Sequence, residues 1–229
     1  MQIDESNKFL DAVKAGDLAV VSSLLAADPQ LLNVRDESGV SVLMLAAYYG
    51  KEEITAYFLS RKGELDIFEA AALADVERLG QLIKRDPSVM CGYSEDGFTP
   101  LGLAAYFGRI ANLTLLVENG ADVNEVSRNQ MHVRPLHSAV AYRQADISLI
   151  IAKRLLESGA QVNAVQHGGW TPLHQAAAHG NLEMVDLLLD YGADPAIKSD
   201  DGRTALMMAE DSQHFPVIRR LIGNKDGSI

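Results

Sequence analysis

Apolar residues recur with helical spacing through residues 168–195, and turn-forming residues divide this stretch into two short predicted helices. Thr171 and Pro172 stand at the start of the first helix, where a hydroxyl can cap the backbone and a missing N–H costs nothing. Gly180 and Gly192 end the two helices, since glycine takes a left-handed conformation at little cost. The apolar face of the second helix is formed by Leu182, Val185, Leu188 and Leu189. Two such helices cannot bury both faces alone, so the stretch predicts copies of itself on either side.

The same pattern recurs along the chain. Aligned on the leucine of Thr-Pro-Leu-His, the copies have as anchors Phe9, Leu43, Ile67, Leu101, Leu136, Leu173 and Leu206. The successive spacings are 34, 24, 34, 35, 37 and 33 residues. We therefore predict one domain over residues 1–229 with seven units, at about 4–36, 37–63, 64–94, 95–128, 129–165, 166–198 and 199–229.

A period near 33 residues with Thr-Pro-Leu-His, an Ala-Ala pair and a closing Gly-Ala-Asp resembles the ankyrin-repeat family. The resemblance covers nearly the whole chain. Within the family, the chain is similar to short stand-alone bacterial ankyrin-repeat proteins. It implies an all-α fold, an α-solenoid of helix–turn–helix units joined by β-turn or β-hairpin fingers. The first and last units depart most from the pattern, as expected of capping units with one face in water.

Two units depart from the pattern in length. Unit 2 is nine residues short after its second helix, so we expect a gap in the row of fingers between units 2 and 3. Unit 5 carries two extra residues in its finger, and four more that we expect between its helices, within residues 143–147.

The chain is acidic, with a formal net charge of −11 and a pI near 4.9. This charge argues against nucleic acid and anionic membranes as partners and favours a partner with a basic surface, although acidity that serves solubility alone is the competing interpretation. Cys91 is the only cysteine, which fits a reducing compartment. No stretch approaches the roughly 20 apolar residues of a membrane span. We expect a soluble, cytoplasmic chain that is monomeric when free.

The candidate chemistry is sparse. His174 and His179 lie about 140° apart around a helix and so do not share a face for a metal ion. No nucleophile motif, phosphate loop or acid–base carboxylate pair occurs, so we predict no catalytic residue, no metal site and no cofactor. The resemblance implies instead that His137 and His174 are buried and bonded to the backbone of the neighbouring repeat.

In ankyrin arrays the finger tips and the two residues before the helix-ending glycine line the concave face. Mapped onto this sequence, the resemblance predicts that ten residues contact a partner: Tyr48, Tyr49, Tyr93, Phe98, Tyr106, Phe107, Tyr142, His167, Trp170 and His179. Five of the seven tyrosines and the single tryptophan are in this set, and both residue types dominate interface hot spots. The alternative is that several of them, especially Tyr49 and Phe107, pack against the adjacent repeat.

The sequence thus predicts a non-enzymatic protein-interaction module or scaffold that binds another protein through its concave surface. The alternative is a regulatory or inhibitory subunit that occludes an enzyme partner. Intrinsic enzymatic or small-molecule-binding activity is a third hypothesis. A stoichiometric partner in purification would favour the first two hypotheses, and activity without a partner the third.

Overall fold

The computed structural model describes residues 2–73 and 76–223, which fold almost entirely as helices. The α-helices of this part of the chain are α1 (Gln2–Ala15), α2 (Leu18–Ala27), α3 (Val42–Tyr48), α4 (Glu52–Leu59), α5 (Ile67–Leu73), α6 (Val76–Arg85), α7 (Pro100–Tyr106), α8 (Ile110–Glu118), α9 (Pro135–Ala141), α10 (Ala145–Glu157), α11 (Pro172–Ala178), α12 (Leu182–Asp190), α13 (Ala205–Asp211) and α14 (Phe215–Gly223). Three 3₁₀ turns accompany them: η1 (Pro29–Asn33), η2 (Pro87–Cys91) and η3 (His167–Gly169).

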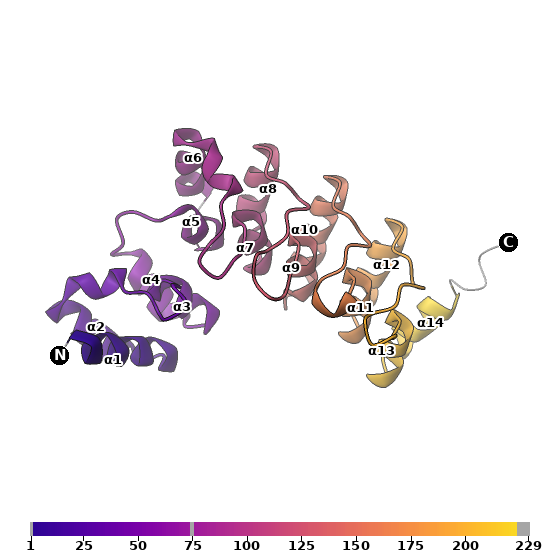
Figure 1. Ribbon diagram of the computed structural model, residues 1–229, viewed down its shortest axis with the longest axis horizontal. Helices are drawn as coiled ribbons and strands as arrows, with labels where there is room; N and C mark the ends of the chain where they lie inside the picture. Colours follow the sequence, from indigo (N-terminus) through magenta and orange to yellow (C-terminus); the bar gives the residue numbers. More distant parts are fainter. Residues whose placement is uncertain (1, 74–75, 224–229) are drawn as a thin grey trace.

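The helices form two parallel rows. In Figure 1, α6, α8, α10 and α12 follow one another along one side of the molecule, and α5, α7, α9 and α11 along the other. Each helix of the inner row packs on the next, and each inner helix packs on the outer helix that follows it in the chain. The predicted all-α solenoid is therefore confirmed.

Helix starts follow the capping chemistry of the sequence. The hydroxyls of Thr99, Thr171 and Thr204 accept the N–H three residues on, and proline follows Thr99 and Thr171 at the first helical position. Asp28 and Asp86 end α2 and α6, and each then accepts an N–H from the 3₁₀ turn that begins at the next proline. The Asp-Pro stops of the first and third units are thus confirmed.

Small residues let the inner helices approach closely. The alanine pairs predicted from the repeat are fully buried at Ala70, Ala71, Ala104, Ala105, Ala176 and Ala177. The larger core residues fill the space between the two rows, and the buried apolar side chains form one continuous core along the array. This matches the expectation that each unit completes its core by packing on its neighbours.

The fingers are tight turns. Among the described residues the one β-bridge joins Arg35 to Ser41, so the fingers are β-turns more than hairpins. Neighbouring fingers are linked through the backbone. The N–H groups of Arg128, His167 and Asp200 donate to the carbonyls of Gly97, Met131 and Gly168 at 2.8, 2.9 and 2.9 Å.

The start of α5 corrects the repeat frame by one residue. The backbone N–H of Glu69 donates to Asp66 Oδ1 at 2.8 Å, and that of Asp66 to Glu69 Oε2 at 3.3 Å, which is a capping box with Asp66 as its first residue. Asp66 therefore corresponds to Thr171, and Phe68, not Ile67, corresponds to Leu173. The spacings around this unit become 25 and 33 residues, so unit 2 is eight residues short.

The expected gap in the row of fingers is closed. The turn of unit 2 lies directly on that of unit 4, because a Cβ built on Gly39 would sit 2.9 Å from Glu95 Cβ. Among the described residues no backbone hydrogen bond links these two turns, unlike the other finger pairs. The outer row is also interrupted, because α6 packs on α8 but has no comparable packing on α4 in this part of the chain. Figure 1 accordingly shows α1–α4 turned away from the row that begins at α5.

The insertion in unit 5 lies in a helix. The connection between α9 and α10 has three residues, as in unit 6, whereas α10 has 13 residues and α12 has 9. The expectation of a longer turn between the helices was therefore wrong. Four added residues make about one helical turn, so they extend the start of α10 and leave its buried face in phase.

Candidate functional site

Four of the ten predicted contact residues form one aromatic cluster, which we call the tyrosine cluster: Tyr48, Phe98, Tyr106 and Phe107. The Tyr48 ring lies 5.9 Å from Tyr106 and 5.4 Å from Phe107, measured between centroids. Phe98 lies 6.3 Å from Tyr106, which lies 5.1 Å from Phe107. These are the tilted and edge-to-face arrangements that aromatic rings prefer. The cluster joins α3 of unit 2 to α7 of unit 4, across unit 3.

Tyr48 connects α3 to the finger that precedes α7. Its hydroxyl donates to Asp96 Oδ2 at 2.6 Å, in the finger that precedes α7. Burial raises the pKa of the Tyr48 phenol far above its usual value, and the Asp96 carboxylate raises it further, so the hydroxyl keeps its proton. Tyr48 thus packs between α3 and the finger before α7, whereas Tyr106 beside it remains 41% exposed.

A groove of about 480 Å³ opens beside this cluster, between α3, α7 and α9. It is lined by Tyr48, Tyr49, Glu52, Tyr106, Phe107, Tyr142 and Arg143, among others. Tyr49 is 52% exposed, so the alternative that it packs against the neighbouring repeat was wrong. Phe107 is half-buried, but its ring contacts are with Tyr106 of its own unit and with Tyr48 of unit 2, two units away.

A second groove, of about 800 Å³, continues the first along the same edge of the array. The two share Ala141, Tyr142 and Arg143, and the second adds His179 and His214 to its lining. The ring of Tyr142 rests against Gly108, where a Cβ would sit 2.3 Å from the ring. The missing side chain of Gly108 leaves room for the Tyr142 ring in this position along the groove.

The remaining predicted residues lie in the fingers and do not share that groove. Tyr93 is covered by the guanidinium of Arg128, 3.9 Å from the ring centroid, and its hydroxyl donates to Glu125. That hydrogen bond raises the pKa of the Tyr93 phenol. Trp170 is half-buried with its ring centroid 6.4 Å from that of His174, and His167 is exposed. The predicted set therefore divides into a helix-end group and a finger group.

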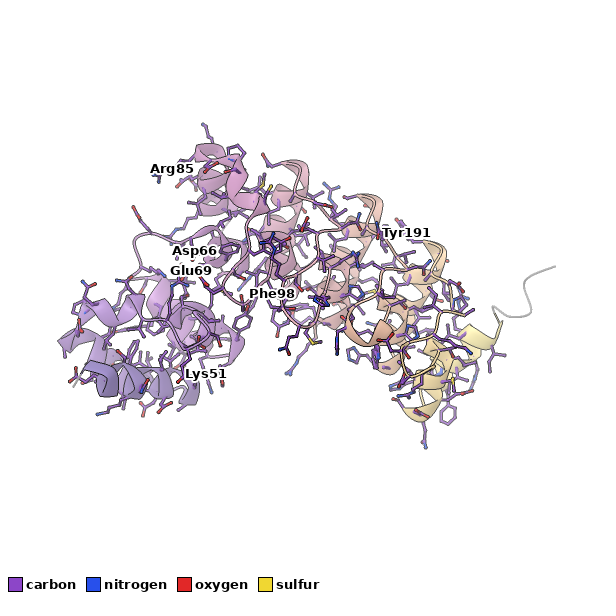
Figure 2. All side chains as sticks on the ribbon, viewed as in Figure 1. Lys51, Asp66, Glu69, Arg85, Phe98 and Tyr191 are labelled. Carbon is purple, nitrogen blue, oxygen red and sulfur yellow. The ribbon has the colours of Figure 1, made fainter. Side chains whose placement is uncertain are left out.

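A buried carboxylate at the start of α5 is the feature that sequence reasoning missed. Glu69 is 1% exposed, and its Oε1 accepts from the hydroxyl of Ser41 at 2.6 Å and from the ammonium of Lys62 at 2.5 Å. It stands where units 5 and 6 carry histidine, and it joins units 2 and 3. The Asp-x-x-Glu spacing of a capping box at residues 66–69 was the available signal. Figure 2 places Asp66 and Glu69 where α1–α4 meet the rest of the array.

The two motif histidines lie as the resemblance implied. His137 Nδ1 accepts the N–H of Arg134 at 3.2 Å, so its Nε2 carries the proton and donates to the carbonyl of Ala164 at 3.1 Å. His174 Nε2 likewise donates to the carbonyl of Arg203, in the next unit, at 3.0 Å. Burial lowers the pKa of His137 to about 4 and lowers that of His174 as well. Both histidines are structural links between units.

Within residues 2–73 and 76–223 no group of three or more His, Cys, Asp or Glu side chains is arranged to hold a metal ion. In the same residues, no helix combines the length and apolar character needed to cross a lipid bilayer.

Comparison with known proteins now adds to this geometry. A family model for ankyrin repeats, described as three copies, matches residues 9–127, 67–164 and 147–229. A putative ankyrin repeat protein of fowlpox virus is 36% identical over 111 residues, which are 48% of this chain and 17% of the viral protein. A putative E3 ubiquitin-protein ligase of Arabidopsis thaliana is 47% identical over 73 residues, 31% of this chain and 19% of that protein.

Synphilin-1 of Mus musculus aligns over 214 residues at 26% identity, which covers 93% of this chain and 20% of that protein. The chain thus spans a fifth or less of each of these three relatives. The family model, by contrast, matches nearly the whole chain, and the matched residues contain the paired helices, the buried alanines and the linked finger turns. The chain belongs to the ankyrin-repeat family.

Proposed function

We propose that the chain is a protein-interaction module that binds a partner protein through the groove beside the tyrosine cluster. The observation that carries this proposal is the exposure of Tyr49 and Tyr106, at 52% and 41%, in a groove of about 480 Å³. Tyrosine contributes a large apolar area and a hydroxyl at low entropic cost, which is why it is frequent at binding hot spots. Ankyrin repeats are generally protein–protein interaction modules, which supports the same proposal.

The roles of the predicted residues differ within this proposal. Tyr49, Tyr106, Tyr142 and His179 offer side chains to the partner, whereas Tyr48, Phe98 and Phe107 hold the exposed rings in place. A groove built on packed helices changes little on binding, so little ordering entropy opposes the association. Tyr93, His167 and Trp170 belong to the finger group and contact only a partner that also reaches the finger turns.

We further infer that the seven units act as one domain and that the chain is a monomer before the partner binds. The exposed thiol of Cys91 supports a reducing compartment such as the cytoplasm. The proposed role is binding without catalysis. The hydroxyl of Thr171 lies 2.8 Å from His174 Nδ1, but both residues are buried, so this pair caps α11 and is closed to a substrate.

Site-specific photo-cross-linking tests the proposed surface. A photoreactive phenylalanine analogue replaces Tyr49 or Tyr106 in separate variants, and Tyr191 in a matched control. Tyr191 is also a partly exposed tyrosine, at 38%, but follows α12, away from the groove (Figure 2). We expect one protein to be captured from native lysate by the groove variants and not by the control. Equal capture from all three positions, or capture from Tyr191 alone, would contradict the proposal.

Alanine substitutions then measure the contribution of each side chain. Tyr106→Ala and Tyr142→Ala are each expected to weaken binding of the captured partner by more than about 1 kcal/mol, with the circular dichroism spectrum unchanged. Trp170→Ala is expected to cause the same loss where the partner also reaches the finger turns. Isothermal titration calorimetry gives the affinities. Full affinity in all three folded variants would remove these residues from the interface.

A further inference from the structure

The chain stacks its own arginines on tyrosines at two places. The guanidinium of Arg128 lies 3.9 Å from the ring centroid of Tyr93, whose hydroxyl is bonded to the Glu125 carboxylate. The guanidinium of Arg61 lies 3.6 Å from the ring centroid of Tyr57. In both, the cation meets the electron-rich face of the ring, and at Tyr93 a carboxylate stands beside it. These two sites show which surroundings suit an arginine in this protein.

The groove beside the tyrosine cluster has the same components but no cation of its own on the rings. The hydroxyl of Tyr48 is bonded to the Asp96 carboxylate, and Glu52 lines the groove next to Tyr49. In the described part of the chain, no arginine or lysine is stacked on Tyr48, Tyr49 or Tyr106. The groove therefore offers exposed tyrosine rings and a carboxylate to a cation from outside the chain.

The charges around the groove favour such a cation on one side. Next to Asp96, the partner of Tyr48, a smaller cavity of about 80 Å³ is lined by the carboxylates of Asp66, Glu95 and Asp96 and by a single basic side chain, Arg35, which pairs with Asp66 at 3.6 Å. Carboxylates on adjoining walls add to one another's field and raise the local concentration of cations. The opposite end of the groove carries Arg143. A cation is thus drawn to the end with Tyr49 and Glu52.

We propose, on the basis of the proposed function, that the groove receives an arginine of an extended basic segment of the partner protein. The guanidinium lies over the exposed ring of Tyr106 or Tyr49 and donates to the carboxylate of Glu52. Arginine suits this site better than lysine, because its planar group stacks on a ring and donates in its own plane to a carboxylate at the same time. The net charge of −11 draws the rest of a basic segment to the array.

Synthetic peptides provide the test. The probes are acetylated and amidated decapeptides of alternating glycine and arginine, glycine and lysine, or glycine and glutamate. Each is titrated into the full ¹⁵N-labelled chain, and amide chemical shifts are followed. We expect saturable shifts with the arginine peptide around residues 48–52 and 105–108, about two- to fivefold weaker binding of the lysine peptide, and no saturable shifts with the glutamate peptide.

Variants identify the groups involved. Tyr106→Ala and Glu52→Gln are each expected to weaken the arginine peptide by about two- to fivefold, whereas Tyr106→Phe retains most of the affinity because the ring face remains. Tyr191→Ala is the control and binds as the unchanged chain does. Glu52 lies on the surface at the start of α4, so its variant keeps the fold even where loss of Tyr106 perturbs the cluster.

The outcomes separate this proposal from the interaction function itself. Equal binding of the glutamate peptide, shifts confined to residues outside the groove, or unchanged affinity in Glu52→Gln would overturn the arginine site. A partner that cross-links to Tyr49 and Tyr106 while the arginine peptide fails to bind leaves the interaction function standing and overturns this inference alone. If neither the cross-linking nor the peptide titration gives the expected result, both the interaction function and the arginine site are contradicted.

Discussion

His137 shows how one side chain both starts a helix and joins two repeats. One ring nitrogen accepts the backbone N–H of Arg134 at the start of α9, and the other donates to the carbonyl of Ala164, at the end of unit 5 just before the finger of unit 6. The bond from Arg134 requires an unprotonated Nδ1, whereas the bond to Ala164 is compatible with either form of the ring, and His137 is 1% exposed. A protonated ring would lose the acceptor at Nδ1 and would carry a charge in the core, so burial favours the neutral form.

The free energy of unfolding is therefore expected to fall on acidification through a defined window. The pKa of His137 is about 4 in the folded chain, against an ordinary value of 6.5. Between these values the unfolded chain binds a proton that the folded chain does not, so stability present above pH 6.5 is lost as the pH falls toward 4. The shift corresponds to about 3 kcal/mol. Urea unfolding at a series of pH values measures it.

The matched variant is His137→Gln, which keeps an acceptor and a donor but does not titrate. Its stability is expected to depend less on pH between 4 and 6.5 than that of the unchanged chain. Addition of His174→Gln should reduce the dependence again, because burial also lowers the pKa of His174. Parallel curves for the unchanged chain and both variants would show that these histidines do not set the acid sensitivity.

At the residue scale, the sequence predicted the burial of scaffold residues better than the exposure of surface residues. The motif positions of His137 and His174 predicted their burial, because the same repeat surrounds each of them. Tyr48 and Tyr49 are neighbours in sequence, yet one is packed against Phe107 and the other is 52% exposed. Their difference depends on how unit 4 approaches unit 2, which no pattern within a single repeat records.

At the scale of elements, α5 is held by a charged network in place of the usual threonine and histidine. Glu69 receives hydrogen bonds from Ser41 at the start of α3 and from Lys62 after α4, and its second oxygen closes the capping box with Asp66. One carboxylate thus contacts three elements. Its place in the core is acceptable because its oxygens are paired with donors.

Glu69→Ala is expected to destabilise the chain by about 3 kcal/mol, because it removes the helix cap and leaves the ammonium of Lys62 without its buried partner. Glu69→Gln keeps the acceptor for Ser41 and is expected to lose less. The control is Glu118→Ala, whose exposed pair with Arg154 at 3.1 Å should contribute under about 1 kcal/mol. Urea unfolding followed by circular dichroism distinguishes them. Equal losses at residues 69 and 118 would show that burial of Glu69 has no energetic consequence.

Element boundaries were predictable where capping residues mark them and less so elsewhere. Thr171 and Pro172 predicted the start of α11, and Asp86-Pro87 the end of α6. The four inserted residues of unit 5 carry no glycine or proline, and helix continuation absorbed them into α10. The one-residue error at Ile67 has a similar cause, since three consecutive alanines at 70–72 let the repeat be aligned in two registers.

At the scale of the whole molecule, the solenoid is least continuous between units 2 and 3. Regular steps of the array combine inner-helix packing, outer-helix packing and a backbone bond between fingers. Among the described residues, the junction after α4 has neither comparable packing between outer helices nor a backbone bond between fingers. The Glu69 network and the tyrosine cluster take their place, and the cluster reaches across from unit 2 to unit 4. The angle between α1–α4 and the remaining array therefore depends on a few side chains.

Loss of the Tyr48 contacts is expected to broaden the distribution of the angle between α1–α4 and the remaining array. Tyr48→Ala removes the bond to Asp96 and the ring contacts with Tyr106 and Phe107, whereas Tyr48→Phe removes the bond alone. Spin labels at Ser23 on α2 and Asp190 on α12, with Cys91 replaced by serine, report the separation of the two parts by double electron–electron resonance. We expect a broad distribution for Tyr48→Ala, an intermediate one for Tyr48→Phe and a narrow one for the unchanged chain.

Labels at Glu118 and Asp190, both within the regular rows, are the control and should give one narrow distribution throughout. Because the groove is lined from both sides of this junction, the alanine variant should also bind the partner more weakly, and a narrow distribution in Tyr48→Ala would show that the Glu69 network alone fixes the angle.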